Sequence, residues 1–481
     1  MRGLTFLFLV LCGVITSCGP DSGSQRVIVL QTGRLSGNVY PLESRQIAPL
    51  QHYPYLGGYV KQVRREAEAT GARVLLVDSG DSLSGSFASH ISASRNMVVF
   101  FNSLNYDAIF LSNLDADVPP EALKALQMPV LSPFMDATGQ SVPAGCSPLH
   151  QVEIQGLRVQ LLANFYGDTR WEDKPTQFPM WFGSQARTVR PVRDYQTLIS
   201  SAGEAQPDLS LFHWTKFPGP GDPSAWVHQL TQLGVDALLA HRTYSSKEQT
   251  RWETADFSGW PLPVNENILR QNGGFTLARL DLIRGRDGRW MAPHPHQVIQ
   301  MTANSAPADM EISELMKPFH DAISTADRSL GVLPDDVSPE QVLNAYFTAL
   351  STVPHAQALF YSEDSIRSPL SRGKLNTSHV YQAIPWSTPL ERVRISSDLL
   401  PRLLEIKGTQ IWVRPGQRTD TDVITSRFFA RIIQRHLNLA DSAVEAAGPD
   451  NEFEFFCRFL ESRPLETVFT GIPQGWEALK P

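Results

Sequence analysis

The chain has 481 residues, of which 42% are hydrophobic and 19% are charged, and its formal net charge is -7 at pH 7. This is the composition of an ordinary soluble globular protein, and the length is too great for one typical domain and ample for two substantial cores. The negative charge provides no basic surface for a phosphodiester backbone, so the sequence predicts no nucleic-acid partner.

The first residues have the organisation of a bacterial lipoprotein signal. A basic residue precedes an apolar run over residues 4–15, and Cys18 follows directly after two small polar residues. Residues 1–17 are therefore predicted to be a signal peptide, Cys18 the lipidated mature N-terminus, and residues 18–26 a polar tether. A plain signal peptide with an incidental cysteine is the alternative. We expect a protein of the bacterial cell envelope, extracytoplasmic and held at the membrane by its N-terminal lipid.

Further along the chain, strand patterns alternate with helix patterns, which is typical of an α/β sandwich. The predicted elements, in order, are a strand over 26–37, a helix over 59–69 that Gly71 ends, helices over 96–104 and 120–126, a hairpin over 151–162 that turns at Gly156, a strand over 273–282 and a helix over 310–325. Residues 168–193, rich in Trp, Pro and charge, are predicted to form a long ordered loop. Cys146 and Cys457, far apart in sequence, are predicted to be separate thiols.

Four short apolar runs each end in a residue type that binds divalent metals. The run over residues 73–81 is continuously apolar before it breaks into Asp-Ser-Gly-Asp81, which is typical of a strand buried on both faces. The other three runs end at Asn113, His213 and His241. In a parallel sheet all four ends would lie on one side, so we expect these side chains to meet there. For each residue alone, a role in capping a loop is the alternative.

The segment from Val27 to about Gln300 resembles the calcineurin-like metallophosphoesterase domain of 5'-nucleotidases. The second to fifth motifs of that family fall, in order and with agreeing spacing, on Gly80-Asp81, residues 112–117, His213 and residues 240–243. The resemblance implies a four-layer α/β/β/α sandwich and a second, α+β, C-terminal domain for the substrate. The implied boundaries are 27–305 for the first domain, 306–328 for a linker helix and 329–481 for the second domain.

Several functional residues of that family are replaced in this chain. The first motif should carry Asp and His after the opening strand, but these positions hold Arg34 and Ser36. The catalytic His of the third motif is Leu114, although the Asp that orients it is present as Asp117, and the last ligand of the fifth motif is Thr243. The resemblance implies that the second metal position is lost and that one position, suited to Zn, Mn or Fe, keeps Asp81, Asn113, His213 and His241.

These replacements change the expected chemistry. A second metal activates the attacking water and stabilises developing charge, so ordinary turnover is not expected without it. Losing the acid or electrostatic role of the missing His typically costs a further factor of about 10²–10⁴. Arg34 is a candidate replacement for the lost metal, because a guanidinium binds a pair of phosphate oxygens with fixed charge. An exposed loop position in a decayed site is the alternative for Arg34.

The C-terminal part matches two substrate-binding motifs of the family. Arg367 lies on a G-G-x-R-like motif, and Trp386 lies on a P-F-x-N-like motif whose aromatic residue stacks on a nucleobase in relatives. Thr388 replaces the Asn of that motif, and a late G-G-D-G loop is not recognisable, so this pocket is eroded as well. For Trp386, a place in the core or at an interface is the alternative.

Together these features predict a lipid-anchored 5'-nucleotidase homologue with a degenerate metal centre, which binds a phosphorylated or nucleotide-like ligand with weak or no hydrolysis. An active phosphoesterase of altered specificity and a non-enzymatic interaction protein of the envelope are the alternatives. Metal-dependent hydrolysis would indicate the enzyme, and ligand-induced thermal stabilisation without turnover would indicate the binding protein.

Overall fold

A computed structural model of the chain describes residues 25–35, 37, 42–43, 46–47, 53–112, 115, 118–136, 138, 140–141, 143–164, 178–182, 185–191, 199, 206–214, 234–240, 276–294, 296–362, 365–385, 388–406, 409–416, 419–470 and 474–479. The signal segment and Cys18 lie outside these ranges, so the lipid anchor stays a prediction. No helix within them combines the length and the apolar character that a membrane crossing needs. Cys146 and Cys457 are free thiols, which confirms that they do not pair.

A seven-stranded sheet forms one layer of the N-terminal half. Its central strand β1 (Arg26–Thr32) is parallel to β4 (Arg73–Asp78) on one side and antiparallel to β14 (Thr276–Arg284) on the other. The outer strands are β5 (Ala108–Phe110) and β6 (Val130–Leu131) beyond β4, and β15 (Trp290–Met291) and β16 (Gln297–Gln300) beside β14. The strand predicted over 273–282 is therefore confirmed as β14.

A four-stranded sheet stacks on the first. β12 (Leu209–Trp214) lies parallel to β13 (Ala237–Ala240) and to β9 (Leu157–Asn164), and β8 (Leu149–Ile154) completes the predicted hairpin that turns at Gly156. Buried aliphatic and aromatic side chains from both sheets fill the space between them. The four strands that carry the candidate ligands thus belong to two sheets. Two stacked sheets agree with the sandwich that the resemblance implied. The simpler argument from one parallel sheet does not hold for all four strands, because β4 and β5 pair in one sheet and β12 and β13 in the other.

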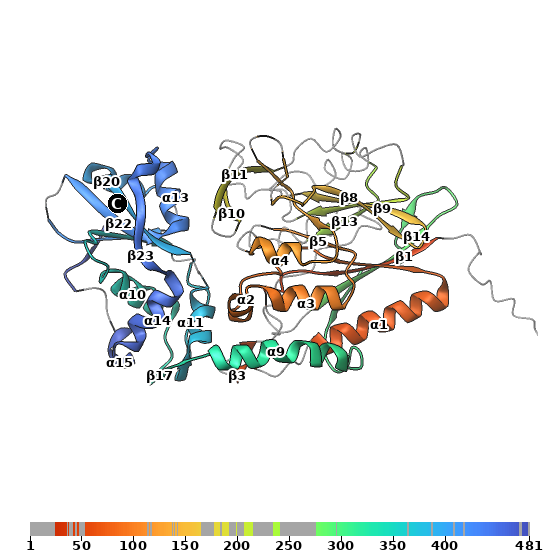
Figure 1. The fold of residues 1–481 in the computed structure, drawn as a ribbon, viewed down its shortest axis with the longest axis horizontal. Coiled ribbons are helices and arrows are strands. Elements are labelled where there is room, and N and C mark those ends of the chain that lie inside the picture. Colours follow the sequence, from red (N-terminus) through yellow and green to blue (C-terminus); the bar gives the residue numbers. More distant parts are fainter. Residues whose placement is uncertain are drawn as a thin grey trace, which may run out of the picture.

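Helices cover the outer face of the seven-stranded sheet (Figure 1). They are α1 (Tyr53–Thr70), α2 (Phe87–Ser92), α3 (Arg95–Ser103), α4 (Pro120–Lys124) and α9 (Met310–Ala326), and α9 packs on α1, α2 and α3. In α1, Leu56, Val60 and Val63 are buried at helical spacing, and the helix ends at Gly71, whose φ is 67°. The four predicted helices are confirmed, three of them to within two residues at each end, whereas α1 begins six residues before the predicted start at Tyr59.

A hairpin lies where the sequence predicted a loop. β10 (Phe178–Phe182) and β11 (Gln185–Pro191) pair with each other, and β11 pairs on its other side with β7 (Phe134–Met135). Pro179 and Pro191 concealed the strand pattern. A proline is tolerated here because β10 is an edge strand and Pro191 is the last residue of β11. A separate short pair is formed by β2 (Leu42–Glu43) and β3 (Gln46–Ile47).

The C-terminal half is built around a six-stranded sheet in the order β23-β20-β22-β18-β21-β24. Its strands are β18 (Ala358–Ser362), β20 (Pro389–Ser396), β21 (Thr409–Val413), β22 (Asp420–Ser426), β23 (Val444–Asn451) and β24 (Glu477–Ala478). β17 (Ser329–Leu333) and β19 (Gly373–Asn376) form a separate pair. The helices of this half are α10 (Pro339–Leu350), α11 (Thr377–Ala383), α12 (Leu400–Leu403), α13 (Arg427–His436), α14 (Glu452–Glu461) and α15 (Leu465–Val468).

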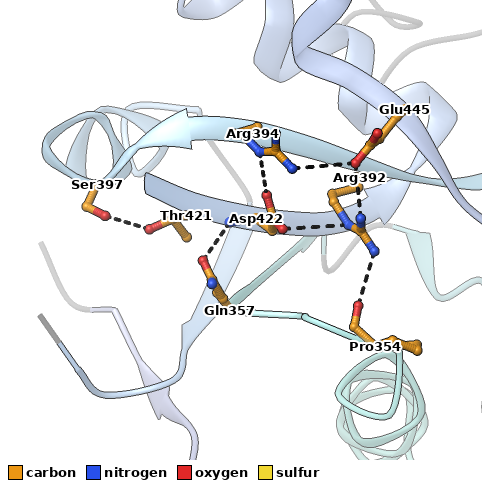
Figure 2. Close-up of polar contacts among 8 residues, drawn as sticks. All are labelled: Pro354, Gln357, Arg392, Arg394, Ser397, Thr421, Asp422 and Glu445. Atoms are coloured by element: carbon orange, nitrogen blue, oxygen red, sulfur yellow. Dashed lines mark hydrogen bonds and ion pairs between the residues drawn. The ribbon is translucent and has the colours of Figure 1, made fainter. Parts of the chain in front are cut away.

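A network of charges joins three neighbouring strands of this sheet (Figure 2). Asp422 on β22 lies between Arg392 and Arg394 on β20, with closest nitrogen–oxygen distances of 3.8 and 3.2 Å. The two guanidinium groups also reach Glu445 on β23, at 3.0 and 3.7 Å. Arg392 donates a further hydrogen bond to the carbonyl oxygen of Pro354 at 3.2 Å. Two positive and two negative charges balance, so the network supports strand pairing without creating a charged patch.

Candidate functional site

The turn after β4 brings the end of that strand against the ends of β1 and β5. The backbone N–H of Arg34 donates to the carbonyl of Gly80 at 2.8 Å, and the N–H of Ser79 donates to the carbonyl of Thr32 at 2.8 Å. Gly80 has a φ of 94°, and a Cβ added there would lie 2.8 Å from the carbonyl oxygen of Phe110. The glycine of Asp-Ser-Gly-Asp is therefore required both for its conformation and for the close approach of β5.

Two candidate site residues, one after β1 and one in the turn after β4, have strained backbones. Arg34 has a φ of 56° and Asp81 a φ of 54°, in the left-handed region that side chains other than glycine rarely adopt. Asp81 is fully buried and Arg34 is half-buried. The backbone hydrogen bond from Arg34 to Gly80 brings the Arg34 backbone next to the residue that precedes Asp81, and the shared site stays a prediction. Backbone strain of this kind gathers at binding and catalytic sites, where the surrounding structure holds it in place.

A buried carboxylate that the sequence analysis did not single out holds this turn. Asp115 accepts backbone hydrogen bonds from Asp81, Ser82 and Leu83, at 2.7, 3.0 and 2.9 Å, and from Ser112 at 3.0 Å. Burial, and then the nearby charge of Asp81, raise the pKa of Asp115 to about 7 against the opposing effect of these hydrogen bonds. The sequence feature that could have predicted this role is an acidic residue three positions after Ser112, a spacing at which a side chain can accept a backbone N–H.

The first acid of Asp-Ser-Gly-Asp has a different role from the second. Asp78 accepts hydrogen bonds from the hydroxyls of Thr32 and Ser82, at 2.7 and 2.9 Å, and from the backbone N–H of Gly80 at 2.9 Å. Burial raises the pKa of this carboxyl to about 7. Asp78 thus ties β1 to the turn, and Asp81 is the acid of this segment that the sequence predicted as a metal ligand.

His213 reaches the same turn from the second sheet. Its ring stacks on Phe110, with centroids 4.2 Å apart and planes 16° apart, and its Nε2 lies 2.8 Å from the carbonyl oxygen of Ser79. A carbonyl oxygen only accepts, so Nε2 carries the proton and Nδ1 is the nitrogen through which this side chain would bind a metal. A metal-binding histidine usually donates its other N–H in this way. The structure therefore brings His213 and the Asp81 turn together, although they come from different sheets.

The other predicted ligands, Asn113 and His241, lie outside the described residues, as does Asp117. Within the described part of the chain, no three His, Cys, Asp or Glu side chains form a group that could hold a metal ion. Asp81 and His213 alone do not amount to a metal site, and we assign no catalytic step to a metal.

The candidate substrate residues belong to the C-terminal half. Arg367 is exposed, and its backbone N–H donates to the carbonyl of Ala383 at the end of α11, at 2.9 Å. Trp386 lies outside the residues that the structure describes. The role of both in substrate binding stays a prediction.

Thr388, at the position where the resemblance implied a replaced Asn, is hydrogen-bonded to a buried acid. Its hydroxyl donates to Glu452 at 2.5 Å, and the same carboxylate accepts hydrogen bonds from Tyr346 and Tyr361 at 3.0 and 2.7 Å. Glu452 is fully buried, and burial raises its pKa to about 7 although all three hydroxyls favour the ionised form. Thr388 is thus held by the first residue of α14.

The architecture is the two-domain α/β fold of 5'-nucleotidases, which confirms the predicted fold class. The chain superposes on the 5'-nucleotidase precursor of Thermus thermophilus with a TM-score of 0.63 at 14% identity, over 91% of this chain and 96% of that chain. The corresponding values for the 5'-nucleotidase of Candida albicans are 0.60 at 12% identity, over 91% and 98%. A sulfate thiohydrolase of Thermus thermophilus gives 0.58 at 12% identity, over 91% and 94%. At such low identities these likenesses concern the fold alone.

Sequence comparison adds a partial match. The chain is 31% identical over 134 residues to a snake venom 5'-nucleotidase of Gloydius brevicauda. The match covers 26% of this chain and 23% of the relative, so the two align over about a quarter of each. No protein-family model matches the chain.

Proposed function

We propose that the chain is a lipid-anchored envelope protein that binds a phosphorylated or nucleotide-like ligand at a degenerate 5'-nucleotidase-type site, with weak or no hydrolysis. The names of the similar proteins support a phosphate-containing ligand, since two solved neighbours and the partial sequence match are 5'-nucleotidases. The observation that carries the proposal is the place of Arg34, on a strained turn hydrogen-bonded to Gly80 beside Asp81.

The chemistry of arginine favours binding over turnover. Its guanidinium offers a planar pair of donors and a permanent positive charge, which suits two oxygens of one phosphate. It cannot generate a hydroxide nucleophile as a metal does, because it lowers no water pKa by coordination. The proposal retains one divalent metal, held by Asp81, Asn113, His213 and His241, which would polarise a phosphoryl oxygen when bound.

The first test is the affinity of an Arg34→Ala variant for inorganic phosphate and for a nucleoside monophosphate, measured by titration calorimetry. Loss of charged hydrogen bonds predicts an affinity lower by about tenfold or more. Arg26→Ala is the matched control, since Arg26 is half-buried at the opposite end of the same strand and pairs with Asp281 at 3.6 Å. An Arg34→Ala variant that binds phosphate as tightly as the Arg26→Ala variant would contradict the proposal.

A second test separates the alternatives. We expect about one divalent metal per purified chain, lost in His241→Ala, and little or no release of phosphate from phosphoesters. Rapid metal-dependent hydrolysis that His213→Ala abolishes would instead indicate an active phosphoesterase. Absence of both metal and phosphate binding would favour the interaction protein, because the scaffold would then be the only feature retained.

A further inference from the structure

Four aromatic side chains join the two halves of the molecule. Phe87 and His90 project from α2, Tyr381 from α11 and Phe453 from α14, and these helices lie side by side (Figure 1). The ring of His90 is 5.1 Å from that of Tyr381 and 5.5 Å from that of Phe453, and Tyr381 and Phe453 are 5.0 Å apart. Phe87 lies 6.0 and 6.1 Å from the same two rings. We call these four residues the aromatic junction.

The start of α2 is bonded to the Asp81 turn. The hydroxyl of Ser86, which caps α2, donates to the carbonyl of Gly37 at 2.6 Å, and the N–H of Gly37 donates to the carbonyl of Ser82 at 2.8 Å. A Cβ added to Gly37 would lie 2.3 Å from the hydroxyl oxygen of Ser89, so the contact between this loop and α2 leaves no free space. The helix that carries Phe87 and His90 is therefore packed on Gly37, which is hydrogen-bonded to the residue that follows Asp81.

The start of α14 is bonded to the loop that contains Thr388. Phe453 is the second residue of α14, and the first is Glu452, whose carboxylate accepts the hydroxyl of Thr388 at 2.5 Å. The backbone N–H of Glu452 also donates to the carbonyl of Thr388 at 3.0 Å. Glu452 thus holds Thr388 in the C-terminal half, and the next residue, Phe453, contacts α2 in the N-terminal half.

We propose that the aromatic junction fixes the Asp81 turn and the Thr388 loop relative to each other, with Phe453 as the positioning residue between them. Phe453 and Phe87 are 1% and 3% exposed, so a shift of one ring displaces its neighbours. The contacts form one continuous path from Asp81 through Gly37 and α2 to α14 and Thr388. The inference goes beyond the proposed function, since it does not depend on what either loop binds.

The experiment compares Phe453→Leu with Phe456→Leu on the same helix. Phe456 is equally buried, but its ring contacts Tyr346 and Phe459, which both belong to the C-terminal half. Hydrogen exchange is measured on the whole chain without ligand. Phe453→Leu should speed exchange of the α2 amides and of residues 81–83 by about fivefold or more, because those segments open more often when the junction is loosened. Phe456→Leu should leave these amides unchanged.

A second variant changes α2 and tests the effect on the C-terminal half. The substitution is milder, so the proposal does not depend on one variant folding well. His90→Ala should speed exchange of the amides at Thr388 and at the start of α14, whereas His150→Ala, at a half-buried histidine on β8, should not. Equal effects of the Phe453 and Phe456 variants, or changes confined to the helix that carries each substitution, would overturn the proposal. A failed phosphate-binding test at Arg34 would leave this result intact, so the two proposals can fail separately.

Discussion

At the scale of single residues, the acidic side chains around the β4 turn divide their roles by environment. Asp78 and Asp115 are saturated with hydrogen bonds from hydroxyls and backbone N–H groups, so they shape the turn. Asp115 and Asp78 accept the backbone N–H groups of Asp81 and Gly80, and so hold Asp81 in its left-handed conformation. This arrangement is expected of a functional side chain on a rigid support. The distinction depends on contacts made by residues far apart in the chain.

The structural role of Asp115 predicts a large effect of Asp115→Asn. An amide presents one acceptor oxygen and an NH₂ group to four N–H donors, so buried donors would lose their partners. We expect the free energy of unfolding to fall by about 2–4 kcal/mol at pH 8, measured by urea denaturation. Asp136→Asn is the control, because Asp136 accepts two backbone N–H groups in a less buried turn, from Thr138 and Gln140. Equal losses in both variants would contradict this role.

At the scale of elements, the distance between neighbouring strands decides which turn residues are tolerated. β4 and β5 approach so closely after Asp78 that the carbonyl of Phe110 occupies the space beside Gly80. Gly156, in the β8–β9 turn, also has a positive φ, but no atom lies within 4 Å of an added Cβ. Both positions therefore favour glycine because of their positive φ, but only Gly80 is also required because no space is left for a Cβ.

This difference predicts unequal costs for the same substitution. Gly156→Ala should lower the free energy of unfolding by about 1–2 kcal/mol, from backbone strain alone. Gly80→Ala should lower it by about 3 kcal/mol or more, since overpacking is added to the strain. It should also weaken phosphate binding, because Asp81 and the partner of Arg34 would shift. Thermal denaturation and phosphate titration of both variants measure this, and similar losses of stability would refute the packing argument.

At the scale of the whole molecule, both halves bury carboxyl groups whose pKa is raised to about 7, Asp78 and Asp115 in the first and Glu452 in the second. A raised folded-state pKa means that the folded protein binds protons more tightly than the unfolded chain. The contribution to stability is therefore complete below the unfolded-state pKa. It is lost as the pH rises through about 7. We expect the free energy of unfolding to decrease from weakly acidic to neutral pH.

Glu452→Gln isolates one part of this pH dependence. The amide oxygen still accepts hydroxyl donors, but the side chain no longer titrates, so the variant should lose less stability than the wild type between about pH 4.5 and 7. The difference in slope should integrate to a value on the order of 3 kcal/mol, measured by urea denaturation across the pH range. Glu121→Gln, at an exposed position on α4, is the matched control for the chemical change from Glu to Gln. Parallel curves for wild type and Glu452→Gln would contradict the prediction.

The sequence by itself determined several local features: the helices α1, α3, α4 and α9, the β8–β9 hairpin, and the turn glycines Gly71 and Gly80. These follow from spacing and residue type within about 20 neighbouring positions, where hydrophobic periodicity is informative. Pro179 in the edge strand β10 and Pro191 at the end of β11 misled the same reasoning, since proline is also a common loop signal.

Only the tertiary structure decided how distant segments combine. It assigned the strands that precede the candidate ligands to two stacked sheets, brought His213 to the carbonyl of Ser79 across 134 positions of sequence, and gave Asp115 its role in holding the Asp81 turn. It also joined α2 to α14 through the aromatic junction. Such contacts join residues that lie far apart in the sequence. Neither hydrophobic periodicity nor motif spacing can therefore predict them.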